Sequence, residues 1–504
     1  MVGGGINGAG VARDLAGRAL SVLLVEQHDL ASHTSSSSTK LIHGGLRYLE
    51  HYEFSLVRKA LAERELLLKS APHIMRPLRF VMPHDPSMRP VWMIRAGLFL
   101  YDHLARREWL PASHAIDLAQ HPAGRPLKPQ FRHGFEYSDA SVDDARLVVL
   151  CAMQAREHGA HVLTRCRCER ARWVDGRWRV DLRRDDGAVH SVSARALVNA
   201  TGPWAASFLH EQLDLPARKA LRLVKGSHIV VPRLFEHEHA YIFQNADGRI
   251  IFAIPYEGDF TLIGTTDVEC RESPGDARAD AQEIAYLCEQ ASRYFAAPVT
   301  PDAVRWTYSG VRPLLDDDSG DPSAVTRDYL LEMHEGAAPL LSVWGGKITT
   351  FRKLAEQAAQ MLCDRLDVHA LPWTARAALP GGDLSRWIET TRRPDHDIAR
   401  FENALAARHP ELPRALCRRW SRSYGSLVEL LLRAGGLGAE VAPGLHEAEL
   451  RYLCEHEWAR SADDVLWRRS KLGLHLSDNE RAAVDRWFAE RQAQQGAPVR
   501  LGAI

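Results

Sequence analysis

The spacing of hydrophobic positions divides the chain into regions of different character. Up to about residue 215, short apolar runs typical of strands alternate with segments of helical spacing. From about residue 373 onward, nearly every segment has helical spacing. Between them lie short alternating runs that predict an antiparallel sheet, at 227–231, 241–244, 250–254 and 261–264. The pattern predicts an α/β unit, a sheet-rich unit and a helical C-terminal unit.

The first 26 residues fit the opening of a dinucleotide-binding unit. Gly3, Gly5 and Gly8 have the spacing G-x-G-x-x-G, and a helix-compatible run follows them. Next comes an apolar strand that ends in Glu26, where a carboxylate can accept hydrogen bonds from ribose hydroxyls. An isolated glycine motif is equally typical of a plain turn, so the strand and its acid decide the interpretation. The predicted phosphate loop comprises Gly3, Gly4, Gly5, Ile6, Asn7 and Gly8.

The strand that should precede these glycines is short. Only Met1 and Val2 stand before Gly3, whereas the first strand of such a unit usually has about five or six residues. We therefore expect either a stunted first strand or a natural start further upstream. Because this strand lies in the middle of the sheet, its loss would weaken both stability and cofactor binding.

A serine-rich loop, Ser35–Lys40, runs into a segment that contains His43, Gly44, Gly45 and Arg47. A flexible linker is the plainer interpretation, but these residue types together suit a loop folded on a flat, polar ring. The stretch Thr34–Glu53 resembles the FAD-binding signature of FAD-dependent glycerol-3-phosphate dehydrogenases, within the wider D-amino-acid-oxidase-like flavoproteins. The resemblance extends over nearly the whole chain. It includes residues 62–72, GFEYSDASVDDARL (134–147), LVNATGPW (197–204), KGSHIVVP (225–232), LIGTTDV (262–268), WTYSGVRPL (306–314), VWGGKITTFRKL (343–354) and residues 449–474.

The resemblance implies a fold of the α/β plus α+β class with three domains. A Rossmann-type FAD-binding domain is expected to be discontinuous, and an antiparallel-sheet substrate (cap) domain to be inserted into it. A C-terminal all-helical domain follows. The expected boundaries are 1–70, 134–215 and 305–372 for the FAD-binding domain, 71–133 and 216–304 for the cap, and 373–504 for the helical domain.

FAD is the implied cofactor, and its expected ligands lie in four segments besides the phosphate loop. The segment Gly346–Thr349 is included because a helix N-terminus with a lysine stabilises negative charge on a reduced flavin. The further ligands are Glu26, Ser36, Ser37, Ser38, Thr39, Lys40, His43, Gly44, Gly45, Leu46, Ala200, Thr201, Gly202, Trp204, Gly346, Lys347, Ile348 and Thr349.

The resemblance implies oxidation of sn-glycerol 3-phosphate to dihydroxyacetone phosphate, by hydride transfer from C2 to flavin N5. Arginine binds phosphate through two N–H groups at once, so Arg47 and Arg312 are the phosphate candidates, with Tyr48 and Lys347 nearby. His228 is the chosen base, because a neutral imidazole can accept the hydroxyl proton. The expected catalytic residues are His228, Arg312 and Lys347. His43 is the alternative base. The plainer interpretation of His228 is a satisfied residue of the core. The plainer interpretation of Arg312, in a loop after a strand, is a surface ion pair.

Composition narrows the setting. Equal numbers of basic and acidic residues, 64 each, give no general affinity for nucleic acid, and no apolar run is long enough to span a bilayer. The eight cysteines suggest no disulfide framework, and the Cys166–Cys168 pair lacks further ligands, so no metal is expected. The resemblance implies a cytoplasmic enzyme bound peripherally to the inner (cytoplasmic) membrane, with quinone as acceptor, and it allows a homodimer.

Three further segments carry expectations. Residues 92–101 predict a packed helix, with an apolar, basic-rimmed surface at a bilayer interface as the alternative. The cluster Arg468, Arg469 and Lys471 predicts a solvated face, with anionic lipid or a partner subunit as the alternative. Residues 138–159 predict a helix capped by Ser141, with two aspartates in its first turn.

Three rival functions remain at this level. The first is an oxidase on the same scaffold that passes electrons to oxygen, and the second is a D-amino-acid-type oxidase. The third is a cofactor-poor protein that results from the short first strand. The choice between a quinone and oxygen as electron acceptor depends on access to the reduced ring.

Overall fold

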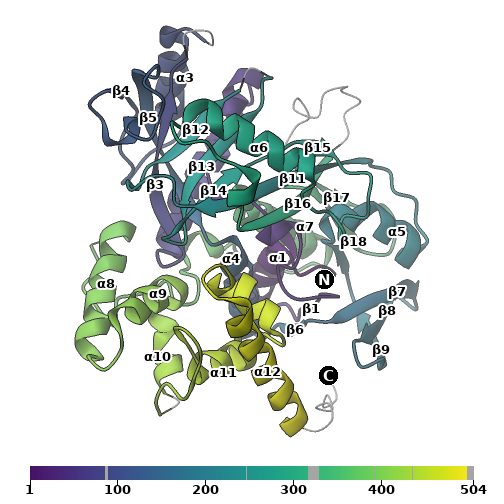
Figure 1. The fold of residues 1–504 in the computed structure, drawn as a ribbon. Coiled ribbons are helices and arrows are strands. Elements are labelled where there is room, and N and C mark those ends of the chain that lie inside the picture. Colours follow the sequence, from purple (N-terminus) through teal and green to yellow (C-terminus); the bar gives the residue numbers. More distant parts are fainter. Residues whose placement is uncertain (86–88, 246, 316–327, 392, 434, 496–504) are drawn as a thin grey trace.

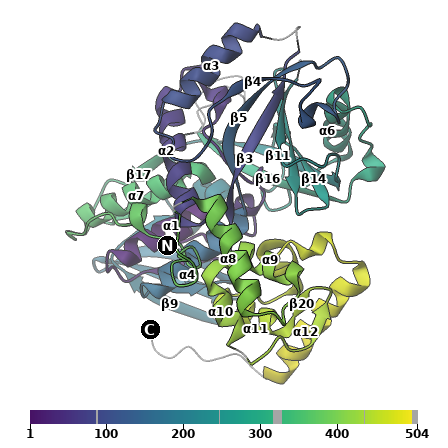
Figure 2. The ribbon, with the colours of Figure 1, turned by 90° about the vertical axis from the view of Figure 1, so that its left-hand side faces the viewer.

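The computed structural model describes residues 1–85, 89–245, 247–315, 328–391, 393–433 and 435–495. The last part of the predicted helical domain, 496–504, lies outside the described residues. Figures 1 and 2 show an α/β unit in the middle, a large sheet above it and a helical unit below it. The predicted fold class is therefore confirmed.

The α/β unit is built on a parallel sheet interrupted at its first strand. β1 (Leu23–Val25) pairs in parallel with β6 (His161–Leu163), and β10 (Leu197–Asn199) pairs with β18 (Leu340–Gly345). Val2 joins the two pairs, because it bridges both Val25 and Asn199 in parallel. The stretch before the glycine motif thus lies in the middle of the sheet, as predicted. Completing the unit are α1 (Ile6–Gly17), α4 (Asp144–Glu157), α5 (Ala205–Leu213), α7 (Phe351–Arg365), β7 (Cys166–Val174), β8 (Arg177–Arg184), β9 (Val189–Ala194) and β17 (Tyr329–Met333).

The large sheet has ten strands and forms the roof of the site. β11 is central to it, because it pairs antiparallel with β14, β15 and β16. The four strands predicted between 227 and 264 are all present. Its strands are β2 (Leu41–Ile42), β3 (Met75–Pro83), β4 (His114–Asp117), β5 (His133–Val142), β11 (Leu221–Pro232), β12 (Ala240–Gln244), β13 (Ile250–Tyr256), β14 (Phe260–Gly264), β15 (Val268–Glu269) and β16 (Trp306–Leu315).

Two local predictions about these strands are wrong. Ser141 lies in β5, and α4 begins only at Asp144, where the Asp143 carboxylate caps it by accepting from the Arg146 N–H. Arg312 lies within β16 rather than in a loop, since β16 continues past it to pair with β11. Both β5 and β16 belong to the ten-stranded sheet, although the predicted boundaries place them with the FAD-binding domain.

Three helices belong to the roof. α6 (Ala281–Tyr294) packs on it through Leu287 and Ala291. α2 (Phe54–Ser70) leads up to the sheet, and α3 (Val91–His103) lies at its tip, at the opposite end from the helical unit (Figures 1 and 2). Only Leu98, Tyr101 and Asp102 of α3 are buried. The prediction of a packed helix is therefore wrong for most of its surface, which faces solvent.

The C-terminal unit has its own core, centred on Phe401, Trp420 and Leu450. It is not entirely helical, because a hairpin of β19 (Glu440–Ala442) and β20 (Leu445–His446) interrupts it. The helices are α8 (Pro394–Arg408), α9 (Arg414–Tyr424), α10 (Val428–Leu432), α11 (Glu447–His456) and α12 (Asp478–Gln495), with a π-helical turn at Asp464–Arg469.

The predicted solvated face at Arg468–Lys471 is wrong. Arg469 and Lys471 are buried, and Arg469 donates to both carboxylate oxygens of Asp29 at 2.6 and 2.8 Å. Arg468 donates to the same carboxylate at 2.7 Å. These side chains fasten the helical unit to the loop that follows β1.

Candidate functional site

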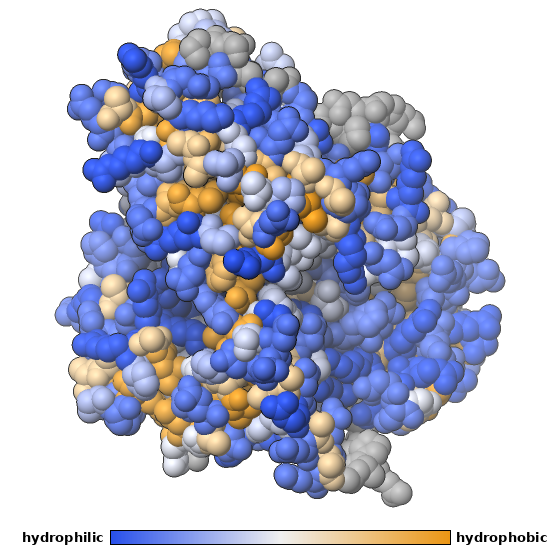
Figure 3. Space-filling view, in the orientation of Figure 1, coloured by the Kyte–Doolittle hydropathy of each residue, from blue (hydrophilic) through white to orange (hydrophobic). Residues whose placement is uncertain are grey.

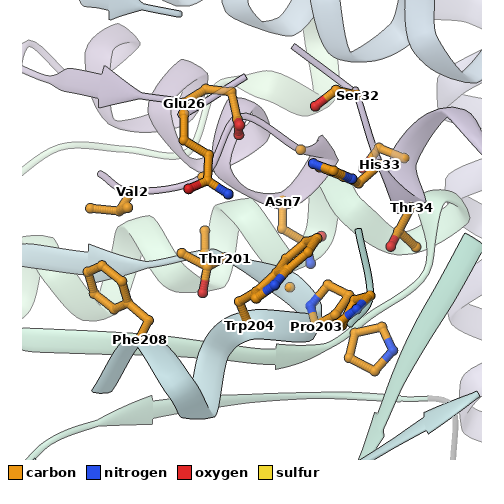
Figure 4. Close-up of a pocket in the computed structure, with 18 of the residues that line it drawn as sticks. Val2, Asn7, Glu26, Ser32, His33, Thr34, Thr201, Pro203, Trp204 and Phe208 are labelled. Atoms are coloured by element: carbon orange, nitrogen blue, oxygen red, sulfur yellow. The ribbon is translucent and has the colours of Figure 1, made fainter. Parts of the chain in front are cut away.

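A cavity of about 520 Å³ opens at the N-terminus of α1 (Figure 4). It lies between the glycine-rich turn, the end of β1 and the segment after β10. Of the predicted FAD ligands it is lined by Gly3, Gly5, Ile6, Asn7, Glu26, Ala200, Thr201, Gly202, Trp204 and Gly346. The sequence motif and the cavity therefore coincide.

The glycines of the motif are needed because the backbone is crowded there. A Cβ on Gly3 would lie 2.4 Å from the Ala200 carbonyl oxygen, and Gly3 has a φ of +108°. A Cβ on Gly8 would lie 1.9 Å from the Gly3 carbonyl oxygen. Both contacts are far shorter than a van der Waals separation, so α1 reaches this position against the strand only with glycine. Its N-terminal N–H groups and dipole then face the cavity, where they favour phosphate.

Two polar side chains aim into this cavity. Glu26 accepts hydrogen bonds from the N–H groups of Gly4 at 2.6 Å and His28 at 2.8 Å. Burial raises the pKa of Glu26, and these two N–H donors oppose the rise. Asn7 donates from Nδ2 to the Gly345 carbonyl, while its buried Oδ1 accepts no hydrogen bond from the described residues. An acceptor without a donor at a helix N-terminus fits a ligand that brings hydroxyl or amide donors.

The loop Thr34–Lys40 connects this cavity to the roof sheet. Ser35 Oγ accepts from the Ile6 N–H at 2.9 Å, at the start of α1. Thr34 donates to the Val311 carbonyl at 2.8 Å, and a Cβ on Gly310 would lie 2.7 Å from Ser37. Thr39 Oγ1 lies 3.0 Å from His228 Nε2. The loop thus follows β16 from the dinucleotide cavity to His228.

Two of the predicted ligands in this loop have side chains bound elsewhere. The Lys40 ammonium lies 2.7 Å from the Asp144 carboxylate, and Ser38 Oγ donates to that carboxylate at 2.7 Å. Burial lowers the pKa of Lys40, and the Asp144 charge opposes this effect. Asp144 sits in the first turn of α4 and so holds the loop in place. The backbone of these two residues is also hydrogen-bonded within the protein, because the Ser38 N–H donates to Asp144 at 3.2 Å and the Lys40 carbonyl accepts from the Val142 N–H at 2.9 Å.

His228 lies on β11 and is buried beneath this loop. Its ring stacks on Tyr308 of β16 at 4.7 Å between centroids. Burial first, and then the charges of Lys40 and Arg312, hold the pKa of His228 well below its ordinary value, so the ring is neutral near pH 7. Its Nδ1 has no hydrogen-bond partner among the described residues. A neutral imidazole held by a ring stack on Tyr308 and by the contact of its Nε2 with Thr39 is suited to accept a proton.

Arg312 crosses from β16 toward β11 above Gly226, where a Cβ would lie 2.3 Å from its guanidinium. Its Nη1 lies 2.5 Å from the Asp267 carboxylate, and its Nη2 donates to the Thr266 carbonyl at 2.7 Å. The guanidinium plane is therefore set by the turn that follows β14. Arg312 and His228 are brought together from two neighbouring strands.

The remaining predicted residues form a second group at the short 3₁₀ helices Leu46–His51 and Ile348–Thr350. The Lys347 ammonium lies 3.5 Å over the Tyr48 ring. The His43 N–H donates to Thr349 Oγ1 at 3.3 Å, which joins the two segments. Arg47 is half-buried beside Tyr48.

The cavity also contains residues that the sequence did not point to. His33 packs edge-on against Trp204, and burial, with the charge of His28 second, lowers its pKa to about 4. His33 belongs to no sequence motif, and only its place just before the serine-rich loop could have indicated it. Other unpredicted lining residues are Gln27, Ser32, Thr34, Ser35, Pro203, Ser207 and Phe208.

Cys166 and Cys168 are buried thiols that line the far side of the cavity. Burial raises the pKa of Cys168 to about 12, so it stays protonated. Within the described ranges, the one group with metal-ligand geometry is His121, Glu136 and His239, and Arg79 is already ion-paired with Glu136. In the same ranges no helix combines the length and the apolarity needed to cross a bilayer. The face in Figure 3 is mostly hydrophilic, with hydrophobic residues in separate patches.

A helix N-terminus against glycines, an acid at the end of β1 and a sheet roof over the cavity define a class of protein. It is an FAD-binding oxidoreductase, and the comparisons agree. Residues 1–352 match the FAD-dependent oxidoreductase family, and residues 372–494 match the C-terminal domain of alpha-glycerophosphate oxidase. FAD is the cofactor of this family and of its structural relative below.

Relatives of similar length narrow the class. The chain is 53% identical to a glycerol-3-phosphate dehydrogenase of Pseudomonas aeruginosa, over 97% of this chain and 94% of that one. It is 49% identical to the aerobic glycerol-3-phosphate dehydrogenase of Escherichia coli, over 98% of both chains. It is also 49% identical to a D-erythritol 1-phosphate dehydrogenase of Brucella abortus, over 97% of both. The structure of a Bacillus halodurans glycerol-3-phosphate dehydrogenase with FAD superposes with a TM-score of 0.78 and 27% identity, covering 98% of this chain and 90% of that one. The chain belongs to the family of FAD-dependent glycerol-3-phosphate dehydrogenases.

Proposed function

We propose that this protein oxidises sn-glycerol 3-phosphate to dihydroxyacetone phosphate at the junction of the dinucleotide cavity and the roof sheet. The observation that carries the proposal is the loop Thr34–Lys40, which starts at the phosphate-binding turn and ends against His228. A flavin reached from that turn would have its ring beside His228 and Arg312. Bound FAD would accept the hydride from C2 of the substrate.

The residues of this chain supply the proton transfer and the substrate's orientation. His228 takes the proton of the C2 hydroxyl, because its depressed pKa keeps it neutral and ready to accept. Thr39 and Tyr308 fix its ring. Arg312 holds the phosphate together with Arg47, and Tyr48 and Lys347 complete the pocket. Removing the guanidinium by Arg47→Met should raise the substrate KM by at least tenfold and leave FAD content unchanged.

The identity of the polyol phosphate also needs a test, because one relative is named for glycerol 3-phosphate and another for D-erythritol 1-phosphate. The test is the absorbance spectrum of the purified protein, before and after anaerobic addition of either compound. Rapid bleaching of bound flavin by glycerol 3-phosphate supports the proposal. Faster bleaching by D-erythritol 1-phosphate would make that compound the substrate in place of glycerol 3-phosphate. No bleaching by either compound would overturn the proposal.

The proposed acceptor is a membrane quinone. Supporting it is the apolar surface of α3, where Trp92 is 68% and Phe99 61% exposed. An amphipathic helix of this kind lies at the boundary of headgroups and acyl chains, next to the apolar layer in which a quinone dissolves. We propose a peripheral enzyme on the cytoplasmic face of the inner membrane, anchored through α3, and a homodimer is consistent with it.

Oxygen is the competing acceptor, because residues 372–494 match a domain that is described for an oxidase, alpha-glycerophosphate oxidase. A quinone-dye assay run beside a peroxide assay separates the two. Turnover with the dye and little peroxide supports the dehydrogenase. Stoichiometric peroxide would identify an oxidase.

A further inference from the structure

A second cavity of about 490 Å³ lies at the C-terminal end of α3. Four basic residues are among those that line it: Arg58 of α2, His103 of α3, and Arg106 and Arg107 in the segment after α3. Arg58 and Arg106 are exposed, so their guanidinium groups face solvent. The mechanism proposed above uses none of these residues.

The cavity is basic even after its acidic neighbour is counted. Asp102 also lines it, but its carboxylate is already bound by Arg107 at 3.0 Å and by the N–H and hydroxyl of Ser113 at 2.8 and 2.6 Å. The C-terminal end of α3 adds about half a negative charge. Three guanidinium groups outweigh both, so the cavity favours an anion.

Exposed hydrophobic side chains are concentrated on the helix that leads to the cavity. Of the ten large hydrophobic side chains exposed in the described part of the chain, five lie on α3: Val91, Trp92, Met93, Phe99 and Leu100. Two more, Tyr52 and Phe54, follow the 3₁₀ helix that contacts α3. A basic pocket at the end of an apolar helix matches a molecule with an anionic head and a long apolar tail. Free phosphate has only the first of these.

We propose that this cavity binds the phosphate of an anionic phospholipid headgroup while the exposed face of α3 enters the apolar layer. Arg58 and Arg106 would donate to the phosphate oxygens, and Arg107 would add charge from its place beside Asp102. This inference rests on the proposed membrane contact and adds selectivity for lipid charge to it.

The experiment measures binding of the FAD-loaded full chain to two kinds of vesicle, pure phosphatidylcholine and a mixture with phosphatidylglycerol. The wild type should bind the mixture more tightly. Arg58→Gln and Arg106→Gln should each reduce that preference by about tenfold or more, because each removes a charge-assisted hydrogen bond to phosphate. Arg95→Gln removes an exposed arginine of α3 outside the cavity. It should cost no more than about fivefold, the effect of one general surface charge.

The outcomes separate the two proposals. A Trp92→Ala/Phe99→Ala variant that still binds both vesicles like the wild type would refute the membrane contact of α3 itself. If that contact holds but Arg58→Gln and Arg106→Gln behave like Arg95→Gln, the cavity is not a lipid site. Inorganic phosphate that stabilises the protein through Arg106, without any preference between vesicles, would assign the cavity to free phosphate and overturn the lipid assignment.

Discussion

The ion cluster between the helical unit and the α/β unit gives the sharpest stability prediction. Asp29→Asn keeps the shape of the side chain and removes its charge. In the wild type this carboxylate binds Arg469 through both oxygens, at 2.6 and 2.8 Å, and Arg468 at 2.7 Å. The two arginines differ in the hydrogen-bond and ion-pair partners that they keep after the substitution.

Arg468 keeps two acidic partners, Asp463 at 2.7 Å and Asp464 at 2.5 Å, and it is partly exposed. Arg469 is fully buried, and the direct contacts that it keeps with other described residues are the Glu457 carbonyl at 2.6 Å and, more distantly, the Glu457 carboxylate at 3.9 Å. Removing one partner of a buried ion pair typically costs about 3–5 kcal/mol. We therefore expect Asp29→Asn to lower the free energy of unfolding by about that amount, through Arg469.

Denaturation followed by tryptophan fluorescence, with FAD in excess, measures the change. The matched control is Glu108→Gln, which breaks the half-exposed pair with Lys69 and should cost about 1 kcal/mol or less. Limited proteolysis should cut Asp29→Asn faster between residues 366 and 394, where the two units join. If Asp29→Asn is no less stable than Glu108→Gln, Arg469 does not depend on this carboxylate and the reasoning fails.

Three other changes test the site and the pH response. His228→Asn should slow anaerobic flavin reduction by about 10²–10⁴-fold with FAD still bound, and His239→Asn should not; equal rates would acquit His228. Gly8→Ala should yield largely colourless protein because its Cβ would strike the Gly3 carbonyl, whereas Gly97→Ala, which meets open space, should stay yellow. Burial lowers the pKa of His73 to about 3, so below pH 6.5 the unfolded chain takes up a proton that the folded chain refuses. Stability should therefore fall between pH 7 and 5, and His73→Asn should reduce that fall by about 2 kcal/mol as measured by denaturation.

Local patterns predicted what local physics determines. The glycine spacing, the strand that leads to Glu26 and the strand at 227–231 depend on neighbours within a few residues, and all are found in the structure. The helical spacing after residue 373 was equally informative. A hairpin as short as β19–β20 leaves too few positions for its period to be recognised.

The failures involve partners far apart in the chain. Arg469 and Asp29 are 440 residues apart, and Lys40 and Asp144 are 104 apart, so no window of sequence contains either pair. Charged side chains without a visible partner suggest solvent, which is why the Arg468–Lys471 cluster was predicted to be exposed. The exposed face of α3 is the opposite case, since apolar residues predict burial unless something outside the chain covers them.

The electrostatics of His228 connect substrate binding to catalysis. Its pKa is depressed by burial and by the charges of Lys40 and Arg312. If Arg312 holds the substrate phosphate as proposed, the dianion offsets the guanidinium charge and the pKa of His228 rises when substrate binds. A higher pKa makes a stronger base, so the base would gain strength only with substrate in place.

This coupling can be measured in single turnovers. The rate of flavin reduction at saturating substrate reports the pKa of the base in the complex, and the rate at low substrate reports it in the free protein. We expect both rates to fall in acid, with the fall at saturating substrate centred at higher pH. In Arg312→Gln the free-protein value should move up toward the wild-type complex, because the charge that depressed it is gone. If the pH midpoints of the two rates are identical in the wild type, the phosphate binds too far from His228 to change its pKa. The phosphate site would then lie at the group around Arg47 and Lys347 and not at Arg312.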